Sequence, residues 1–284
     1  MSEGSPLINL GLGDLTKPAT TLIEKISDAI EGWYKPYQIR RIAAAEAKAE
    51  IIKAEAQIEM TDLQRRALVR FVAEEAQKQD NIEKITQKAI PQLEGSANPK
   101  NIENDWIVNF FDKCRIISDD EMQSLWARVL AGEANSPGKY SKRTINFLSS
   151  LDKIDANCFT ALCGFCWWLD NIVPLIFDVS HEIYNEKGVS FNVLRHLDNI
   201  GLVNFNNLAP FQRLDLPKRI QALYYGMPLH IEFEKETGND LTLGTVLLTQ
   251  IGQELAPLCG SEPVEGFRVF EGRSYVLGDG WSCT

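Results

Sequence analysis

The sequence predicts a mainly α protein with three parts: a long N-terminal helical arm, a central helical bundle and a C-terminal winged-helix-like α+β portion. Residues 37–90 contain neither glycine nor proline, which is typical of a long helix. Residues 91–101 combine Pro, Gly, Ser and Asn as linkers do, and strand-like alternation begins only in the last third of the chain. We therefore expect three domains, residues 1–94, 95–180 and 181–284.

The arm begins with an amphipathic helix in "TKPATTLIEKISDAIEGWY". Thr16 is a candidate cap, and Pro18 lies in the first turn, where its missing N–H costs nothing. Apolar side chains then recur at helical spacing, at Leu22, Ile23, Ile26 and Ile30. Gly32 and Pro36 end this first helix.

The glycine-free run that follows is rich in Ala, Glu, Lys and Gln, with both charge signs at helical spacing. As one helix or a bent helix pair it would be on the order of 75 Å long, and a helix of that length cannot bury itself. Its apolar stripe predicts self-association or docking of a partner protein through Ile39, Ile42, Ile51, Ile52 and Ile58. Two ordinary helices that fold back at a break near Thr61 and Asp62 are the alternative.

Central helices are predicted after residue 101. Ser118 and Glu121 match a capping box, and the apolar residues that follow them recur at helical spacing. The most apolar window, "ALCGFCWWLDNIVPLIF", is interrupted by Asp170, Asn171 and Pro174, so we interpret it as core and not as a membrane-spanning helix.

The last third predicts a winged-helix pattern. "SFNVLRHLDNIGLVNF" is typical of a helix that ends at Gly201 and leads into a strand, and "YYGMPLHIEFEKE" alternates like a strand. "GTVLLTQIGQELAPL" predicts a strand followed by a helix capped at Thr249. Arg195 and His196 would then lie on the candidate recognition helix, although Asp198 on the same helix opposes contact with DNA.

The stretch "LAGEANSPGKYSKRT", residues 130–144, contains the residue types of a phosphate-binding loop. A Walker loop has four residues between its first glycine and the Gly-Lys pair, whereas five separate Gly132 from Gly138 here. Tyr140 also separates Lys139 from Ser141, and a helix instead of a strand precedes the stretch. We expect a helix-turn-helix connection that binds no nucleotide.

No catalytic, cofactor-binding or metal-binding residue is predicted. Cys163 and Cys166 form a single CxxC pair between bulky aromatic residues, without the second pair that a structural zinc site needs. The three histidines, His181, His196 and His230, lie in different predicted elements, and no catalytic motif is recognised. An enzyme is therefore not predicted.

The chain is acidic, with a net charge of -10, which opposes nonspecific nucleic-acid binding. Glu residues among the basic residues of the arm favour a solvated helix that faces a partner protein over one that faces nucleic acid or a membrane surface. No secretory signal is recognised, so we expect a cytoplasmic protein whose six cysteines are free thiols.

Several segments carry a family resemblance. "KPATTLIEKISDAI", "KPYQIRRIAAAEAKAE", "EMTDLQRRALVRFVAEEAQKQDNIE" and the central "DWIVNFFDKCRIISDDEMQSLWARVLAGEANSPGKYSKRTINFLSSLDKIDA", with "LTQIGQEL", resemble the bacterial family called domain of unknown function 2806, over about residues 14–258. That family implies no catalytic residues. "LWARVLAGE" with "YSKRT" is also similar to the abortive-infection alpha proteins, a group linked to bacteriophage resistance.

We therefore predict a non-enzymatic protein-interaction or assembly component of a bacterial antiphage defence system, a homo-oligomer or a partner-binding protein through its N-terminal helices. A winged-helix DNA-binding regulator, using Arg195 and His196, is one alternative. An effector or toxin with an unrecognised active site is the other.

Overall fold

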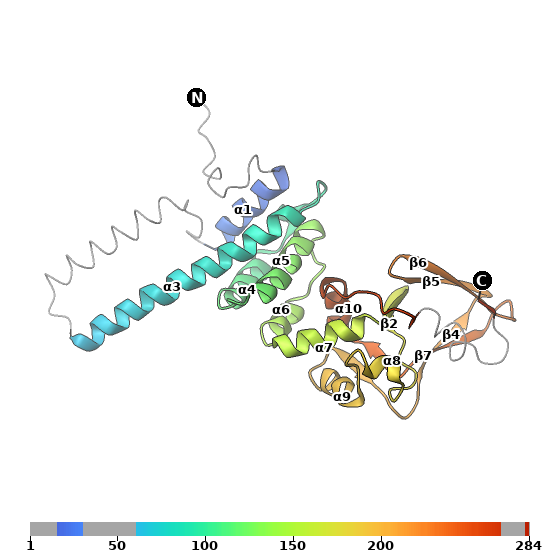
Figure 1. The fold of residues 1–284 in the computed structure, drawn as a ribbon. Coiled ribbons are helices and arrows are strands. Elements are labelled where there is room, and N and C mark those ends of the chain that lie inside the picture. The colour runs from blue at the N-terminus through green and yellow to red at the C-terminus, as the bar shows by residue number, and fades with distance from the viewer. Residues whose placement is uncertain (1–15, 31–60, 268–281, 284) are drawn as a thin grey trace. The chain divides into compact units, whose positions relative to one another are not determined.

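The computed structural model describes residues 16–30, 61–267 and 282–283, which belong to two compact units, Met1–Ser149 and Ser150–Thr284. The described residues of the first unit form helices, and those of the second mix helices with antiparallel strands (Figure 1). The fold is mixed α/β with more helix than strand. The boundary between the units lies in the sequence between Ser149 and Ser150, which differs from the division into three predicted domains.

The first unit contains five described α-helices and two short 3-10 helices. They are α1 (Lys17–Ala29), α3 (Asp62–Ala89), η2 (Ile90–Gln92), η3 (Pro99–Asn101), α4 (Asn104–Cys114), α5 (Asp120–Asn135) and α6 (Lys142–Leu148). The predicted first helix is confirmed as α1, with Thr16 at its N-cap position and Pro18 in its first turn. Leu22, Ile23 and Ile26 are its buried face.

The start of α3 is determined by a capping box. The Thr61 hydroxyl accepts a hydrogen bond from Gln64 N at 3.3 Å, and the Gln64 side chain accepts one from Thr61 N at 3.0 Å. The predicted break near Thr61 and Asp62 is therefore present. Residues 37–60 lie outside the described residues, so two helices that fold back at this break stay a prediction.

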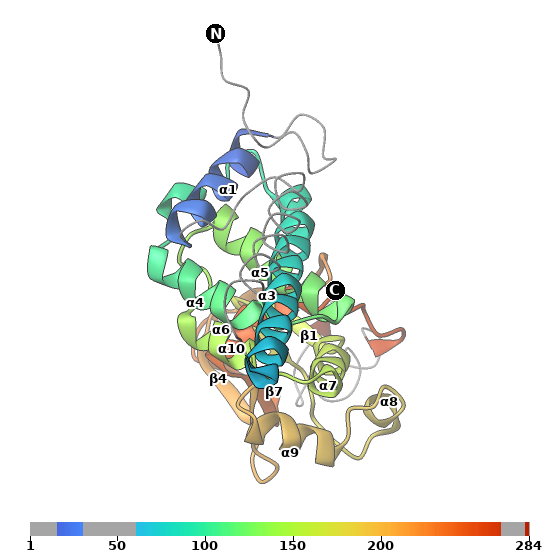
Figure 2. The ribbon, with the colours of Figure 1, turned by 90° about the vertical axis from the view of Figure 1, so that its left-hand side faces the viewer.

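The core of the first unit lies between α3, α4 and α5. The C-terminal part of α3 runs along α5 in both ribbon views (Figures 1 and 2). Phe110 stacks on Trp106 and meets Trp126 edge-on, with ring centroids 5.1 Å apart in each pair. Lys88 of α3 reaches across to the Asp120 carboxylate at the start of α5, at 2.6 Å.

The predicted linker, residues 91–101, is part of this unit. Asn135 of α5 accepts a hydrogen bond from Glu94 N at 3.0 Å, and Ala134 O accepts one from Asn98 N at 3.0 Å. A domain boundary in this segment is therefore wrong, because its backbone is bonded to α5. The helix predicted after Ser118 is present, but Asp119 caps it, through Met122 N.

The second unit contains four described α-helices and nine described strands. The helices are α7 (Lys153–Cys163), α8 (Glu182–Asn185), α9 (Phe191–Asn199) and α10 (Gln250–Leu255), with η4 (Ala256–Leu258) after α10. The strands are β1 (Cys166–Leu169), β2 (Asn171–Pro174), β3 (Val203–Phe205), β4 (Phe211–Leu216), β5 (Arg219–Tyr224), β6 (Met227–Glu232), β7 (Asn239–Gly244), β8 (Val246–Leu248) and β9 (Ser282–Cys283).

All paired strands in these sheets are antiparallel. The largest sheet has the order β2-β1-β5-β6-β9, and β3 with β8 and β4 with β7 form two separate ladders. The apolar window around Trp167 and Trp168 was expected in the helical bundle, which is wrong, since it forms the β1–β2 hairpin. Asp170, with a φ of 62°, forms the reversal between the strands. Aromatic residues suit the pleated surface of a sheet as well as a helical core.

The local signals near the end of the chain are confirmed. The helix α9 is followed by Gly201 with a φ of 88° and then by β3, and Thr249 caps α10 by accepting from Gly252 N at 3.2 Å. The core of the second unit contains Trp167 stacked on Tyr224, with centroids 4.9 Å apart. Among the described helices, none has the length and apolar character needed to cross a membrane.

Candidate functional site

The N-terminal part of α3 lies outside the core. From Asp62 to Asp80 no residue is buried, and this part of the helix extends beyond α4 and α5 (Figure 1). At 1.5 Å per residue its length is about 28 Å. Large apolar side chains are nevertheless exposed here: Leu63 is 69% exposed, Phe71 59% and Val72 42%. We call residues 62–80 the exposed half of α3.

The apolar side chains of the exposed half continue the face that the same helix buries further along. Leu63, Ala67 and Phe71 follow one another at intervals of four residues, and Leu68 and Val72 lie in the adjacent row. Ala67 precedes the fully buried Ile85 by five whole turns, and Leu68 precedes the buried Thr86 by the same interval. A face that packs inside the unit at one end of α3 is therefore uncovered at the other end.

Charged side chains occupy another side of the exposed half. Arg66 pairs with Asp62 at 3.5 Å and Arg70 pairs with Glu74 at 3.3 Å, both one turn apart. The charges are also unequal along the helix: residues 62–70 carry three Arg and one Asp, a net +2. Residues 72–80 carry Glu74, Glu75 and Asp80 against Lys78, a net -2. Phe71 is the midpoint between the two segments.

The isoleucines predicted to form the interface on the arm lie outside the described residues: Ile39, Ile42, Ile51, Ile52 and Ile58. The exposed half of α3 is not among these predicted residues, although Leu63, Ala67 and Phe71 form an apolar row with four-residue spacing.

The phosphate-loop-like stretch connects α5 to α6, as predicted. The Glu133 carboxylate, 2% exposed, accepts hydrogen bonds from Gly138 N at 2.6 Å and from Tyr140 N at 2.9 Å. Backbone amides that hold a phosphate in a Walker loop are thus already bonded to a carboxylate of the chain itself. The Glu133 side chain therefore stabilises a turn, and the amides of Gly138 and Tyr140 are bonded to it.

Tyr140 connects the same turn to the core through packing and a hydrogen bond. Its ring lies on Gly132, where a Cβ atom would approach the Tyr140 hydroxyl oxygen to 2.7 Å. Its carbonyl oxygen accepts a hydrogen bond from the Trp106 indole at 2.7 Å. The glycines of this stretch therefore serve packing and a turn, since Gly138 has a φ of 88°.

The candidate DNA-contacting residues are both on α9. Arg195 is exposed, whereas the His196 Nε2 atom lies 2.6 Å from the Asp155 carboxylate of α7. The two side chains thus face different surroundings, and His196 contributes to the packing of α9 against α7.

The predicted cysteine pair is part of a group of three thiols. Cys163 interacts with both Cys166 and Cys259, and burial raises the pKa of Cys163 well above its usual value. The contact with Cys163, followed by burial, also raises the pKa of Cys259. Cys163 and Cys259 are therefore protonated thiols and poor nucleophiles at neutral pH.

The other side chains considered as metal ligands, the histidines, lie on different elements. His181 caps α8 by accepting from Ile183 N, whereas His230 lies on β6. Within the part of the chain that the structure describes, no group of three or more His, Cys, Asp or Glu side chains is arranged to hold a metal ion.

Comparison with known proteins gives one finding. The model of the family described as "Protein of unknown function (DUF2806)" matches residues 65–269, which include most of α3 and nearly all of the second unit. No curated protein and no solved structure matches the chain.

Proposed function

The chain belongs to the DUF2806 family of proteins of unknown function, and we propose that it is a non-enzymatic interaction or assembly component of a bacterial antiphage defence system that self-associates through α3. The observation that carries this proposal is the uncovered apolar face of the exposed half. A solvent-surrounded helix of this length is marginal by itself, because most helical stability in proteins comes from packing of an apolar face. Burial of one side chain such as Phe71 contributes roughly 1.5–3 kcal/mol.

A second copy of the chain is the partner that the charges favour. If two exposed halves pack antiparallel about Phe71, the +2 segment of one copy lies along the -2 segment of the other, twice over. A parallel arrangement places like charges together and is disfavoured. The apolar rows of both copies then meet in the centre, and the ion pairs of Arg66 and Arg70 remain at the rim.

Light scattering on the full-length chain tests this proposal with matched variants. Phe71→Glu places a charge in the centre of the apolar face, whereas Ala73→Glu adds the same charge to an exposed position on the opposite side of the helix. We expect dimers for the wild type and for Ala73→Glu, and monomers for Phe71→Glu. A wild type that is monomeric at about 50 μM, well above the Kd of a specific interface, contradicts self-association.

A charge-reversal variant tests the antiparallel pairing of the two copies. The double variant Arg65→Glu and Arg66→Glu changes the +2 segment to net -2, so two antiparallel copies repel each other. We expect a dimer weakened about tenfold or more at low salt, with a smaller effect at 1 M salt because screening shortens the range of the interaction. An unchanged dimer affinity refutes the antiparallel pairing but leaves the apolar contact intact.

The defence role is supported by the similarity of the central segment to the abortive-infection alpha proteins. The Glu133 turn makes that segment a structural connection, so we expect the defence role to depend on assembly and not on catalysis. Plaque counts on cells that express the protein with its neighbouring genes are the measurement. Protection that is lost with Phe71→Glu and retained with Ala73→Glu supports the role, and equal protection by both variants contradicts it.

A winged-helix DNA-binding regulator is the second proposal. It is favoured by the order of elements, since α9 is followed by β3. The strand β3 pairs antiparallel with β8, from Val203 and Leu248 to Phe205 and Val246. Arg195 is available to DNA, whereas His196 is bonded to Asp155. Salt-dependent DNA binding that Arg195→Glu abolishes supports this function, and no binding at 50 mM salt ends it.

A further inference from the structure

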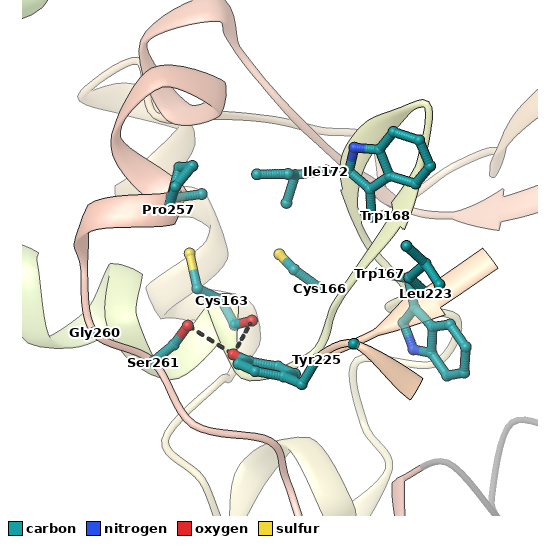
Figure 3. A pocket seen from close by; sticks show the side chains of 12 residues that line it. Cys163, Cys166, Trp167, Trp168, Ile172, Leu223, Tyr225, Pro257, Gly260 and Ser261 are labelled. Atoms are coloured by element: carbon teal, nitrogen blue, oxygen red, sulfur yellow. Dashed lines mark hydrogen bonds between the residues drawn. The ribbon is translucent and has the colours of Figure 1, made fainter. Parts of the chain in front are cut away.

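The second unit contains a cavity that the proposed assembly role does not use. Its volume is about 340 Å³, within the range of about 300–1,000 Å³ of small-molecule sites. Segments distant in the sequence build it: the end of α7, the strand β1, the β5–β6 turn and the chain after α10. In Figure 3, Trp168 and Pro257 lie on opposite sides of it, Tyr225 lies below, and the Cys166 sulfur lies between them.

The wall of this cavity is uncharged and mostly apolar. No lining residue is Asp, Glu, Lys, Arg or His. Cys166 and Trp168 are two residues apart in β1, so their side chains point to the same side of the sheet. Trp168 is 47% exposed at the rim, and neutral thiols such as that of Cys163 pack favourably against aromatic rings. The wall thus suits an aromatic ring system and disfavours an ion.

One side of the cavity is polar. The Tyr225 hydroxyl lies 3.1 Å from the Cys163 carbonyl oxygen and 2.6 Å from the Ser261 hydroxyl (Figure 3). The Tyr225 hydroxyl donates to the Ser261 Oγ atom, which keeps a second lone pair for a donor in the cavity. Burial raises the pKa of Tyr225, so it remains a neutral phenol. The hydroxyl pair is therefore a partner for a hydroxyl group.

Tyr225 has a backbone conformation that its residue type disfavours. With Gly226 it forms the two-residue turn between β5 and β6, and their φ values are 47° and 81°. Such a turn prefers Asn-Gly, and a side chain such as tyrosine costs about 1–2 kcal/mol in the left-handed region. Strained residues concentrate at binding sites, and here the strain places the phenol on the cavity wall.

The geometry points to this cavity as a binding site for a small, uncharged aromatic molecule that carries one hydroxyl group. The ring packs against Trp168 and the cysteine sulfurs, and the hydroxyl bonds to Tyr225 and Ser261. A charged relative of the same ligand is excluded, because it loses its hydration and meets no opposite charge in the wall.

The test is a ligand-observed NMR titration of the full-length chain with 2-naphthol. An aromatic fragment of this size binds with a Kd of roughly 0.1–1 mM when its site fits. We expect 2-naphthoate, with the same rings and a carboxylate, to bind at least about tenfold more weakly. Equal affinities for the two compounds, or no binding of 2-naphthol up to about 3 mM, overturn the inference.

Two variants locate the binding. Trp168→Ala removes an aromatic wall, and Tyr225→Asn supplies the preferred turn residue while it removes the phenol, so the hairpin is retained. Each is expected to weaken 2-naphthol binding about three- to tenfold. Phe191→Ala, which truncates a ring 45% exposed on α9 and outside the cavity, is the control and leaves the Kd unchanged. Wild-type affinity in both Trp168→Ala and Tyr225→Asn refutes the site.

Discussion

Replacing Glu133 by Gln tests whether the central stretch acts as a structural turn. The buried carboxylate accepts two backbone hydrogen bonds, at 2.6 Å from Gly138 N and 2.9 Å from Tyr140 N. Gln has one acceptor oxygen, so one of the two amides loses its partner and faces an NH₂ group. Loss of a hydrogen bond to a charged group costs about 1.5–3 kcal/mol. We expect Glu133→Gln to lower the free energy of unfolding of the first unit by about 2 kcal/mol.

Hydrogen exchange measured by mass spectrometry is the assay, because it reports on the turn itself. The amides of residues 136–141 are expected to exchange about tenfold or more faster in Glu133→Gln, since 1.4 kcal/mol corresponds to a factor of ten. Glu103→Gln makes the same charge change at an exposed position and is the control. Unchanged exchange in Glu133→Gln, or equal effects of the two variants, refutes the role of the Glu133 carboxylate.

Two further predictions compare one glycine from each unit and remove one side chain of the second unit. Gly138→Ala and Gly244→Ala change glycines of nearly equal φ, 88° and 92°, but only at Gly244 would the new Cβ overlap a neighbour, the Ile176 carbonyl oxygen. In urea unfolding we expect the free energy of unfolding to fall by about 1–2 kcal/mol for Gly138→Ala and by several kcal/mol for Gly244→Ala. Equal losses for the two variants contradict the close approach of Gly244 to the Ile176 carbonyl oxygen. Gln253 bonds both Ile172 N, at 3.0 Å, and Ile172 O, at 2.6 Å, at the end of the largest sheet. Gln253→Ala should cost about 1–3 kcal/mol by thermal unfolding, and a stability equal to wild type contradicts its role.

Elements with strong local signals were predictable from the sequence. Gly201 ends its helix because only a residue tolerant of positive φ continues the chain there, and Thr249 caps the next helix with its own hydroxyl. Both effects involve neighbours within a few residues. The turn at Gly138 was predictable for the same reason.

Elements that depend on distant contacts were not predictable. Residues 91–101 have linker composition, but Asn135 binds Glu94 N from 41 residues away and makes the segment part of the first unit. The β1–β2 hairpin contains aromatic residues that suit a helical core equally well.

The two candidate sites differ in how much of each could be predicted from the sequence. The apolar row Leu63, Ala67 and Phe71 was readable from spacing, but only the structure distinguishes the exposed half of α3 from the half buried against α5. The aromatic cavity joins Trp168, Tyr225 and Ser261 from separate segments, so no spacing predicted it. A tyrosine before Gly226 in a tight turn was the one unusual local feature.

The exchange of backbone amides in α3 as a function of protein concentration tests self-association through α3 most directly. The exposed half of α3 is residues 62–80, whereas residues 81–92 pack inside the first unit. The exchange of residues 81–92 is therefore the internal reference for each measurement. We predict that exchange in residues 62–80 slows as the concentration rises from about 0.1 to 100 μM, a range that spans the Kd of ordinary specific dimers, while residues 81–92 are unaffected. Exchange in residues 62–80 that is independent of concentration would contradict the account.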